Sequence, residues 1–168
     1  MQYRVSEKQP NSKMCFVCGL KNDFGILAEF YETADEELIA VFKPKTEHQG
    51  YPGRLHGGIA AAVLDETIGR TVMIGKEEEI WGVTLELNIK YKKPIPLDAE
   101  IKVKAWLTYE DKRIFKGHGE IYSPDGKIAA YADGRYLRVP IEKIADFDRQ
   151  ENEWRKVSSP RDSEIIEI

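Results

Sequence analysis

The feature that most constrains this sequence is one apolar helix set among strands. His56-Gly57-Gly58 leads into residues 59–74, where alanines and a leucine favour helix and Gly75 favours its C-terminal end. Wound at about 100° per residue, this segment carries apolar side chains nearly all round. A helix of that kind cannot lie on a solvated surface, so we expect a sheet to cover it.

The segments around this helix have the patterns of strands joined by tight turns. The expected strands are residues 26–32, 38–42, 81–91, 100–109, 114–122 and 127–139. Strands of this length with such turns favour an antiparallel meander after the helix. The predicted fold class is therefore α+β, with one long central helix wrapped by an antiparallel sheet. Within 81–91, strict alternation puts Leu85, Leu87 and Ile89 on one face and Thr84 on the other.

The length and composition suit one domain with a solvated surface. The chain has 168 residues, of which 42% are apolar, and a formal net charge of −4. That charge argues against broad nucleic-acid binding. We expect an irregular N-terminal segment over 1–24, a folded domain over 25–139, and a charged, loosely docked tail over 140–168 with a helical turn near 141–147.

Membrane and secreted classes are also disfavoured. No apolar run approaches the roughly 18 residues that a membrane span needs, and the first residues contain no signal-peptide stretch. We therefore expect a cytoplasmic protein that binds neither membrane nor nucleic acid.

Cys15 and Cys18 form the chain's single CxxC motif, which has three interpretations. Two cysteines cannot make a disulfide framework. They can serve the structure, act as a redox pair, or make half a zinc site, which needs two further ligands. His48, His56 and His118 are the only histidines, and none lies at ligand spacing from the pair. A structural role is the simplest interpretation, and we predict no metal site.

Two adjacent acids on the helix are expected to behave differently. Glu66 stands four residues before Arg70, the favourable order for an ion pair on a helix. Asp65 has no basic residue three or four positions away. A short carboxylate on an apolar face is costly without a partner. Asp65 should therefore find donors from another segment or act as a base with a raised pKa.

The start of the helix is the second unusual feature. Gly57 and Gly58 carry no side chains, so the first backbone N–H groups and the positive end of the helix dipole are open to a ligand. An oxyanion requires such donors. The alternative is that the glycines only permit a tight turn into the helix. His56 and Thr84 have equally plain alternatives, as a helix cap and an outward-facing strand residue.

Taken together, these motifs resemble a known family. The HGG loop, the LDE on the helix and the strand GVTLELNIKYKKPIP resemble hotdog-fold acyl-CoA thioesterases of the PaaI type, in the 4-hydroxybenzoyl-CoA thioesterase superfamily. CFVCGLKNDFGI is similar to a segment before the first strand in one branch of it. The resemblance covers roughly residues 15–139. It implies a hotdog fold, a homodimer or homotetramer joined sheet to sheet, and active sites at the dimer interface.

The resemblance also implies the catalytic residues. Asp65 matches the helix carboxylate that attacks the thioester or activates water. Gly57 matches the glycine whose N–H polarises the thioester carbonyl. His56 matches the histidine that orients the loop or the thioester, and Thr84 matches a Ser/Thr position that places the water or the carboxylate. The implied reaction is hydrolysis of an acyl-CoA to free acid and CoA, without metal or cofactor beyond the CoA of the substrate.

Substrate binding is implied less directly. Many members carry Asn or Gln in the loop before the HGG motif, where this chain has Gly50 with Gln49 beside it. The lysines after the helix can receive CoA phosphates or simply solvate an edge strand. The expected substrate-binding residues are Gln49, Gly50, Gly58, Lys90, Lys92 and Lys93.

Two other functions fit the same resemblance. A hotdog enoyl hydratase or dehydratase uses a histidine and a carboxylate as an acid–base pair on the substrate carbons. A non-catalytic acyl-CoA-binding domain keeps the pocket without turnover. The retained Asp65 argues against a pure binder, while the missing loop asparagine leaves that alternative open.

Overall fold

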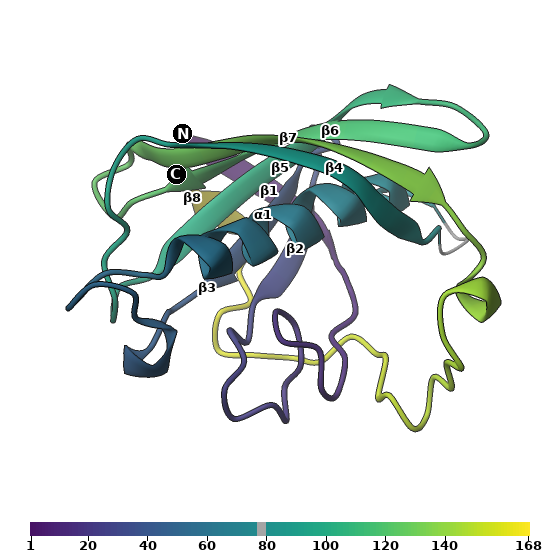
Figure 1. The fold of residues 1–168 in the computed structure, drawn as a ribbon, viewed down its shortest axis with the longest axis horizontal. Coiled ribbons are helices and arrows are strands. Elements are labelled where there is room, and N and C mark those ends of the chain that lie inside the picture. The colour runs from purple at the N-terminus through teal and green to yellow at the C-terminus, as the bar shows by residue number, and fades with distance from the viewer. Residues whose placement is uncertain (77–79) are drawn as a thin grey trace.

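A computed structural model describes residues 1–76 and 80–168 of the chain. Its strands form one antiparallel sheet in the order β4-β7-β6-β5-β3-β2-β1-β8, which bends around a single α-helix (Figure 1). The strands are β1 Gln2–Lys8, β2 Glu29–Thr33, β3 Leu38–Phe42, β4 Gly82–Tyr91, β5 Ile101–Glu110, β6 Ile114–Tyr122, β7 Ile128–Arg138 and β8 Ile165–Glu167. The helix α1 spans Gly57–Arg70, and short 3-10 turns lie at Thr46–His48, Thr71–Met73 and Ile141–Lys143. The predicted fold class is confirmed.

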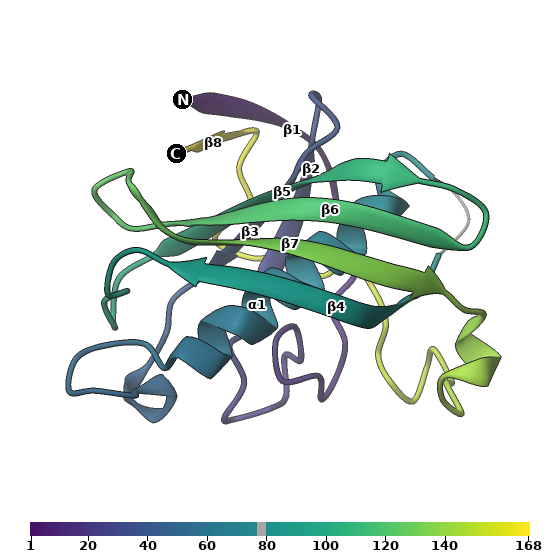
Figure 2. The same cartoon turned by 45° about the horizontal axis from the view of Figure 1, so that its top comes forward.

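Helix α1 lies between the sheet and a layer of loops (Figures 1 and 2). On the sheet side it approaches β6 closely, because Cβ atoms built at Gly117 and Gly119 would come within 2.7 and 2.8 Å of Ile68. On the other side Val17 and Cys18 of the N-terminal segment join the same hydrophobic core. This enclosure explains why the helix is apolar nearly all round.

The predicted meander is wrong at its first strand. β5, β6 and β7 are consecutive neighbours as expected, but β4 pairs with β7 rather than with β5. Local patterns of alternation identify strands without identifying their partners. The result is that β4 forms one edge of the sheet, beside the middle of α1.

The two ends of the chain are more ordered than expected. The predictions of an irregular 1–24 and a loosely docked tail are wrong at β1 and β8, which pair with each other and bring the termini together (Figure 1). Tyr3 of β1 and Ile166 of β8 cover Tyr31 and Ile39 on the outer face of the sheet. Packing in this second small core stabilises β1 and β8 as strands, although their sequences alone look charged and irregular. None of the described helices is long and apolar enough to cross a membrane.

Candidate active site

The carboxylate of Asp65 lies halfway along α1 and is held by two hydroxyl groups. Thr84 Oγ1 donates to its two oxygens at 2.9 and 3.1 Å. The Tyr136 hydroxyl lies 3.1 Å from Oδ1 and 3.0 Å from the main-chain oxygen of Asp65. The prediction that Asp65 finds donors from another segment is confirmed, with β4 and β7 supplying them.

A bulge in β4 brings Thr84 to this position. Thr84 lies opposite Tyr136, but the register shifts before Glu86, so that Leu85 is an extra residue in β4. Beyond the bulge Leu87 pairs with Gly134 and packs against the core. The strict alternation predicted for this strand is therefore wrong, because a bulge rotates the side chains that precede it. Thr84 faces the helix, and its interpretation as an outward-facing strand residue is excluded.

Burial sets the protonation of this group. Desolvation raises the pKa of Asp65 above its ordinary value, the hydroxyls of Thr84 and Tyr136 oppose that rise, and the negative charge of Glu66 adds to it. Burial and the neighbouring carboxylate also raise the pKa of Tyr136, which keeps its hydroxyl protonated and able to donate. Asp65 is thus a carboxylate of increased basicity in a fixed orientation.

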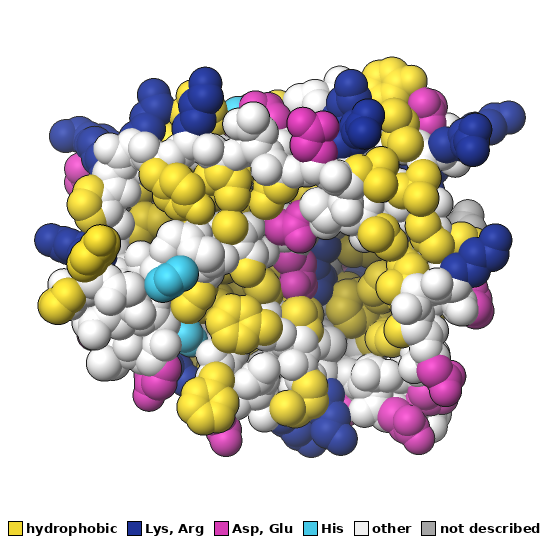
Figure 3. Space-filling model, viewed as in Figure 1, with side chains coloured by type: hydrophobic (Ala, Val, Ile, Leu, Met, Phe, Trp, Pro, Cys, Tyr) yellow, Lys and Arg dark blue, Asp and Glu magenta, His cyan; other side chains and the backbone are white. Residues whose placement is uncertain are grey.

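A cavity of about 390 Å³ opens beside Asp65. Its apolar wall includes Trp81, whose ring centroid lies 5.3 Å from that of Phe147 and 5.1 Å from that of Trp154. Figure 3 shows this face, with a hollow in which charged side chains lie beside hydrophobic ones. The C-terminal tail therefore supplies aromatic walls, which its sequence pattern does not reveal.

The start of α1 is arranged differently. His56 caps the helix, and its Nδ1 accepts the Gly58 N–H at 2.9 Å, while its carbonyl accepts the N–H groups of Ile59 and Ala60. These contacts leave the Gly57 N–H as the first-turn donor that they do not use. The Tyr91 hydroxyl donates to the Gly57 carbonyl at 2.8 Å. The helix start thus presents a backbone donor in a defined orientation.

The loop before the helix packs against this end. Gln49 is exposed, and its side-chain oxygen accepts the Gly53 N–H at 2.8 Å, which holds the side chain within the loop. A Cβ at Gly50 would lie 3.1 Å from the Cα of His56, so the loop passes close to the helix start. Both predicted binding residues therefore lie beside Gly57 rather than beside Asp65.

The three predicted lysines lie near the same end of β4, but not all of them border the groove at the helix start. Lys92 and Lys93 border a groove of about 440 Å³ that also contacts Gly57. Lys90 points to the outer face of the sheet, where its Nζ lies 5.9 Å from the ring centroid of Tyr131. Lys92 Nζ lies 5.2 Å from the same ring, so Lys92 both borders the groove and joins Lys90 over Tyr131.

The two halves of the predicted site are separate within one chain. Asp65 follows Gly57 by eight residues on the same helix, which corresponds to about 12 Å along its axis. One reacting carbonyl cannot touch both. Tyr136 contacts Asp65 but is not among the predicted site residues. The sequence feature that could have identified it is a polar tyrosine at a position of β7 that faces the core.

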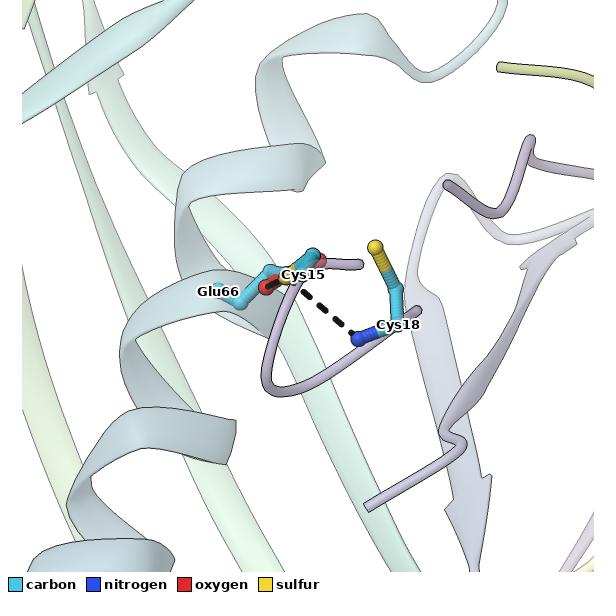
Figure 4. Close-up of side chains that lie close together, drawn as sticks. All are labelled: Cys15, Cys18 and Glu66. Carbon is cyan, nitrogen blue, oxygen red and sulfur yellow. Dashed lines mark hydrogen bonds between the residues drawn. The ribbon is translucent and has the colours of Figure 1, made fainter. Parts of the chain in front are cut away.

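Beside Asp65, the neighbouring acid turns toward the N-terminal segment. Arg70 Nη2 and Nε lie 2.8 and 3.0 Å from Glu66 Oε1, so the predicted ion pair is confirmed. Glu66 Oε2 accepts from the Cys15 thiol at 3.1 Å (Figure 4). A hydrogen bond from Cys18 lowers the pKa of Cys15, and the same bond, followed by burial, raises the pKa of Cys18.

Comparisons with known proteins agree with this arrangement. Residues 52–130 match the family model of the thioesterase superfamily. The chain is 35% identical to rat acyl-coenzyme A thioesterase THEM4 over 111 residues, which are 65% of this chain and 46% of that protein. It is 28% identical to human acyl-coenzyme A thioesterase THEM5 over 115 residues, 68% of this chain and 45% of that protein. The chain thus spans about half the length of the curated relatives it matches.

Solved structures share the fold. The thioesterase superfamily protein RHA08564 has a TM-score of 0.66 at 25% identity, covering 73% of this chain and 59% of its own. The Haemophilus influenzae thioesterase HI1161 has a TM-score of 0.65 at 15% identity, with coverages of 74% and 86%. The Bacillus halodurans protein BH2602, solved with CoA, has a TM-score of 0.59 at 25% identity, with coverages of 67% and 74%. By its sequence match over residues 52–130 this chain is similar to the thioesterase superfamily, and by its architecture it has the hotdog fold.

Proposed function

We propose that this chain hydrolyses an acyl-CoA thioester to a free carboxylic acid and CoA. The observation that carries the proposal is Asp65, a half-buried carboxylate of raised pKa that two hydroxyl groups orient beside an apolar cavity. The names of the curated relatives and the CoA-bound neighbour support the same substrate class.

In the proposed reaction Asp65 either takes a proton from an attacking water or attacks the thioester carbonyl itself. Water oxygen ends on the acyl carbon, the carbon–sulfur bond breaks, and the CoA sulfur leaves with a proton. Thr84 and Tyr136 act by fixing the carboxylate. The tetrahedral intermediate carries an oxyanion, which needs a donor such as the Gly57 N–H.

Because one chain separates Asp65 from Gly57 by about 12 Å, we propose that each site takes them from two chains. Thr84 lies near one end of β4, beside Asp65, and Tyr91 at the other end, beside Gly57. Antiparallel pairing of two β4 strands about a twofold axis sets the Thr84 end of one against the Tyr91 end of the other. Asp65 then faces the partner's Gly57.

The edges of the sheet favour β4 as that interface. β8, at the opposite edge, has three residues, whereas β4 has ten. On β4 Val83 and Leu85 remain 39% and 47% exposed. A long edge strand with exposed apolar side chains is a template for pairing and is normally covered. A homodimer joined through β4 covers it.

The substrate's two parts suit the two surroundings. The acyl group suits the cavity beside Asp65, with Trp81, Phe147 and Trp154 in its wall. The CoA phosphates suit the groove at the helix start, where Lys92 and Lys93 lie near the Gly57 end. A thioester with its acyl group in the cavity and its CoA in the groove would place its carbonyl between the two.

The test measures thiol release from short, medium, long and aromatic acyl-CoAs by the wild-type chain and by Asp65→Asn. We expect turnover of at least one substrate, and a loss in Asp65→Asn on the order of 10²–10⁴-fold with binding retained. Asp125→Asn, in the exposed turn between β6 and β7, is the matched control and should keep full activity.

Three outcomes would contradict the proposal. Binding of acyl-CoA without turnover by the wild-type chain would favour a non-catalytic binding domain. Hydration of an enoyl-CoA without thiol release would favour the hydratase. Equal turnover by wild type and Asp65→Asn would show that the chemistry lies on another residue.

A further inference from the structure

Two thiols and a carboxylate gather on the wall of the cavity, and the hydrolysis proposed above does not use them. Cys15, Cys18 and Glu66 place one donor atom each within 4.8 Å of the others (Figure 4). We propose that these residues bind a thiophilic divalent cation of the Zn²⁺ class, which fastens the N-terminal segment to helix α1. The proposal does not depend on thioester hydrolysis.

The spacing of the three donor atoms is close to that of a zinc site. Zn–S bonds of about 2.3 Å and Zn–O bonds of about 2.1 Å in a tetrahedron separate the ligand atoms by roughly 3.4–3.8 Å. Cys15 Sγ and Glu66 Oε2 already lie 3.1 Å apart, and no pair of donor atoms needs to close by more than about 1 Å, within the reach of small side-chain rotations. Three protein donors leave a fourth position for water, and the cavity gives solvent access to the cluster.

The CxxC turn is built to present its sulfur atoms together. The N–H groups of Val17 and Cys18 point at Cys15 Sγ, at 3.3 and 3.5 Å, and the Gly19 N–H closes the turn on the Cys15 carbonyl at 2.8 Å. A Cβ at Gly19 would lie 2.3 Å from that carbonyl oxygen, so only glycine fits there. N–H groups aimed at sulfur favour the thiolate, the form that binds metals.

Glu66 is held in place as the third ligand. Its Oε1 accepts two hydrogen bonds from Arg70, so its Oε2 is directed at Cys15. Arg70 is itself buried, and its guanidinium lies 4.1 Å from the ring centroid of Phe30. Ligating carboxylates are typically oriented by such an outer hydrogen bond.

The charges balance when a divalent cation is bound. Two thiolates and the Glu66 carboxylate carry three negative charges, and the cation with Arg70 carries three positive ones. A buried cluster that is neutral overall avoids the cost of an unpaired charge. Arg70 also donates to the Pro10 carbonyl at 2.9 Å, so the N-terminal segment already contacts α1 around the site.

The contacts favour a metal over a redox pair. A disulfide between Cys15 and Cys18 has no use for a third group, yet Glu66 contacts Cys15 directly. A carboxylate beside the thiol also opposes formation of the thiolate that thiol–disulfide exchange needs. A cation removes that repulsion and uses the same carboxylate as a ligand. Zinc remains the expected class because thiolates select soft cations.

The test titrates Co²⁺, a spectroscopic substitute for Zn²⁺, into the full chain after removal of metal under reducing conditions. We expect one Co²⁺ per chain, a thiolate-to-cobalt charge-transfer band, and displacement of the band by Zn²⁺. Cys15→Ser should remove most of the band. Glu66→Gln should keep two thiolates but weaken binding on the order of 10–100-fold. Glu47→Gln, on an exposed turn, is the matched control and should bind as the wild type does.

Because Cys18 is buried, Cys18→Ser risks misfolding, and the partly buried Cys15 with Glu66 therefore decides the test. A wild-type chain that shows no band and retains no metal by mass spectrometry would overturn the proposal. Disulfide formation with oxidised glutathione in a chain that does not bind Co²⁺ would overturn it in favour of a redox pair. Unchanged affinity in Glu66→Gln would remove the carboxylate from the site. None of these measurements depends on hydrolysis.

Discussion

The start and the middle of helix α1 present opposite chemistry. At the start, His56 caps an exposed turn without using the Gly57 N–H, and Gly57 shares a groove with Lys92 and Lys93. In the middle, Asp65 is half-buried among hydroxyls at an apolar cavity. In the proposed reaction one end stabilises negative charge, and the other accepts a proton. Ester-type hydrolysis needs both, so the difference indicates two half-sites rather than one site per chain.

Replacing the backbone donor sharpens this comparison most. Proline has no N–H but is well tolerated at the first position of a helix, and the extended backbone of His56 suits a following proline. We expect Gly57→Pro to lower kcat by about 10²–10³-fold, as loss of an oxyanion donor does.

Gly57→Ala is the matched control for that change. Its methyl group would lie 3.6 Å from the Tyr91 ring, an ordinary contact, and its N–H is retained. Steady-state kinetics should therefore separate the two variants clearly. Equal activity in Gly57→Pro and wild type would mean that this N–H takes no part.

Mixing two inactive chains tests whether the half-sites combine across a dimer. A dimer of one Gly57→Pro chain and one Asp65→Asn chain contains one site with both residues intact. With random pairing, co-expression should restore about a quarter of the wild-type activity per chain. Separately purified homodimers provide the baseline. If Gly57 and Asp65 act within one chain, the mixture stays as inactive as its components.

Much of this arrangement follows from the sequence because its causes are local. The apolar helix, the strand 38–42 and the Glu66–Arg70 ion pair depend on propensity and on spacings of a few residues. The α-helix ends earlier than predicted, at Arg70, and a 3-10 turn over Thr71–Met73 continues it toward Gly75. The sequence also predicts that Asp65 needs donors from distant segments, because no basic residue lies three or four positions from it on the helix.

The rest depends on contacts between distant segments. Contacts between distant strands determine that β4 pairs with β7. The same contacts determine that a bulge turns Thr84 toward Asp65. Tyr136 lies 71 residues from Asp65, and Glu66 lies 51 from Cys15. Glu66 lies far from the CxxC motif in the sequence, so spacing alone does not connect it with the two cysteines. No local pattern records those distances.

A smaller effect is expected from one of the hydroxyls that hold Asp65. Tyr136→Phe keeps the ring that stacks on Phe115 at 4.9 Å and removes one hydrogen bond, worth about 1 kcal/mol or roughly fivefold in rate. That donor favours the ionised carboxylate, so its loss raises the pKa of Asp65 further. The acid limb of the kcat/KM profile should therefore move to higher pH.

Tyr109→Phe is the control for this change, because Tyr109 is exposed near the end of β5 and its hydroxyl donates to Asp111, away from Asp65. Its pH profile should coincide with that of the wild type. An acid limb that stays in place in Tyr136→Phe would show that Tyr136 does not set the basicity of Asp65.

The smallest expected effect is on stability, and it separates the middle of the helix from its start. Burial raises the pKa of Asp65 in the folded chain, so ionised Asp65 destabilises the fold at neutral pH. Asparagine carries no charge, and its amide oxygen still accepts from Thr84 and Tyr136. We expect Asp65→Asn to raise the free energy of unfolding at pH 7 by about 0.5–2 kcal/mol, the usual gain from relieving a functional residue.

The raised pKa of Asp65 also sets the pH range over which Asp65→Asn is more stable than the wild type. As the pH falls through the raised pKa, wild-type Asp65 becomes protonated, and the advantage of Asp65→Asn should shrink toward zero. Urea unfolding at pH 7 and at acid pH measures both values, with Asp125→Asn as the control that gains nothing. A destabilised Asp65→Asn at pH 7 would mean that the carboxylate is an ordinary stabilising acceptor. Asp65 would then not carry the cost that a catalytic base of raised pKa imposes on its fold.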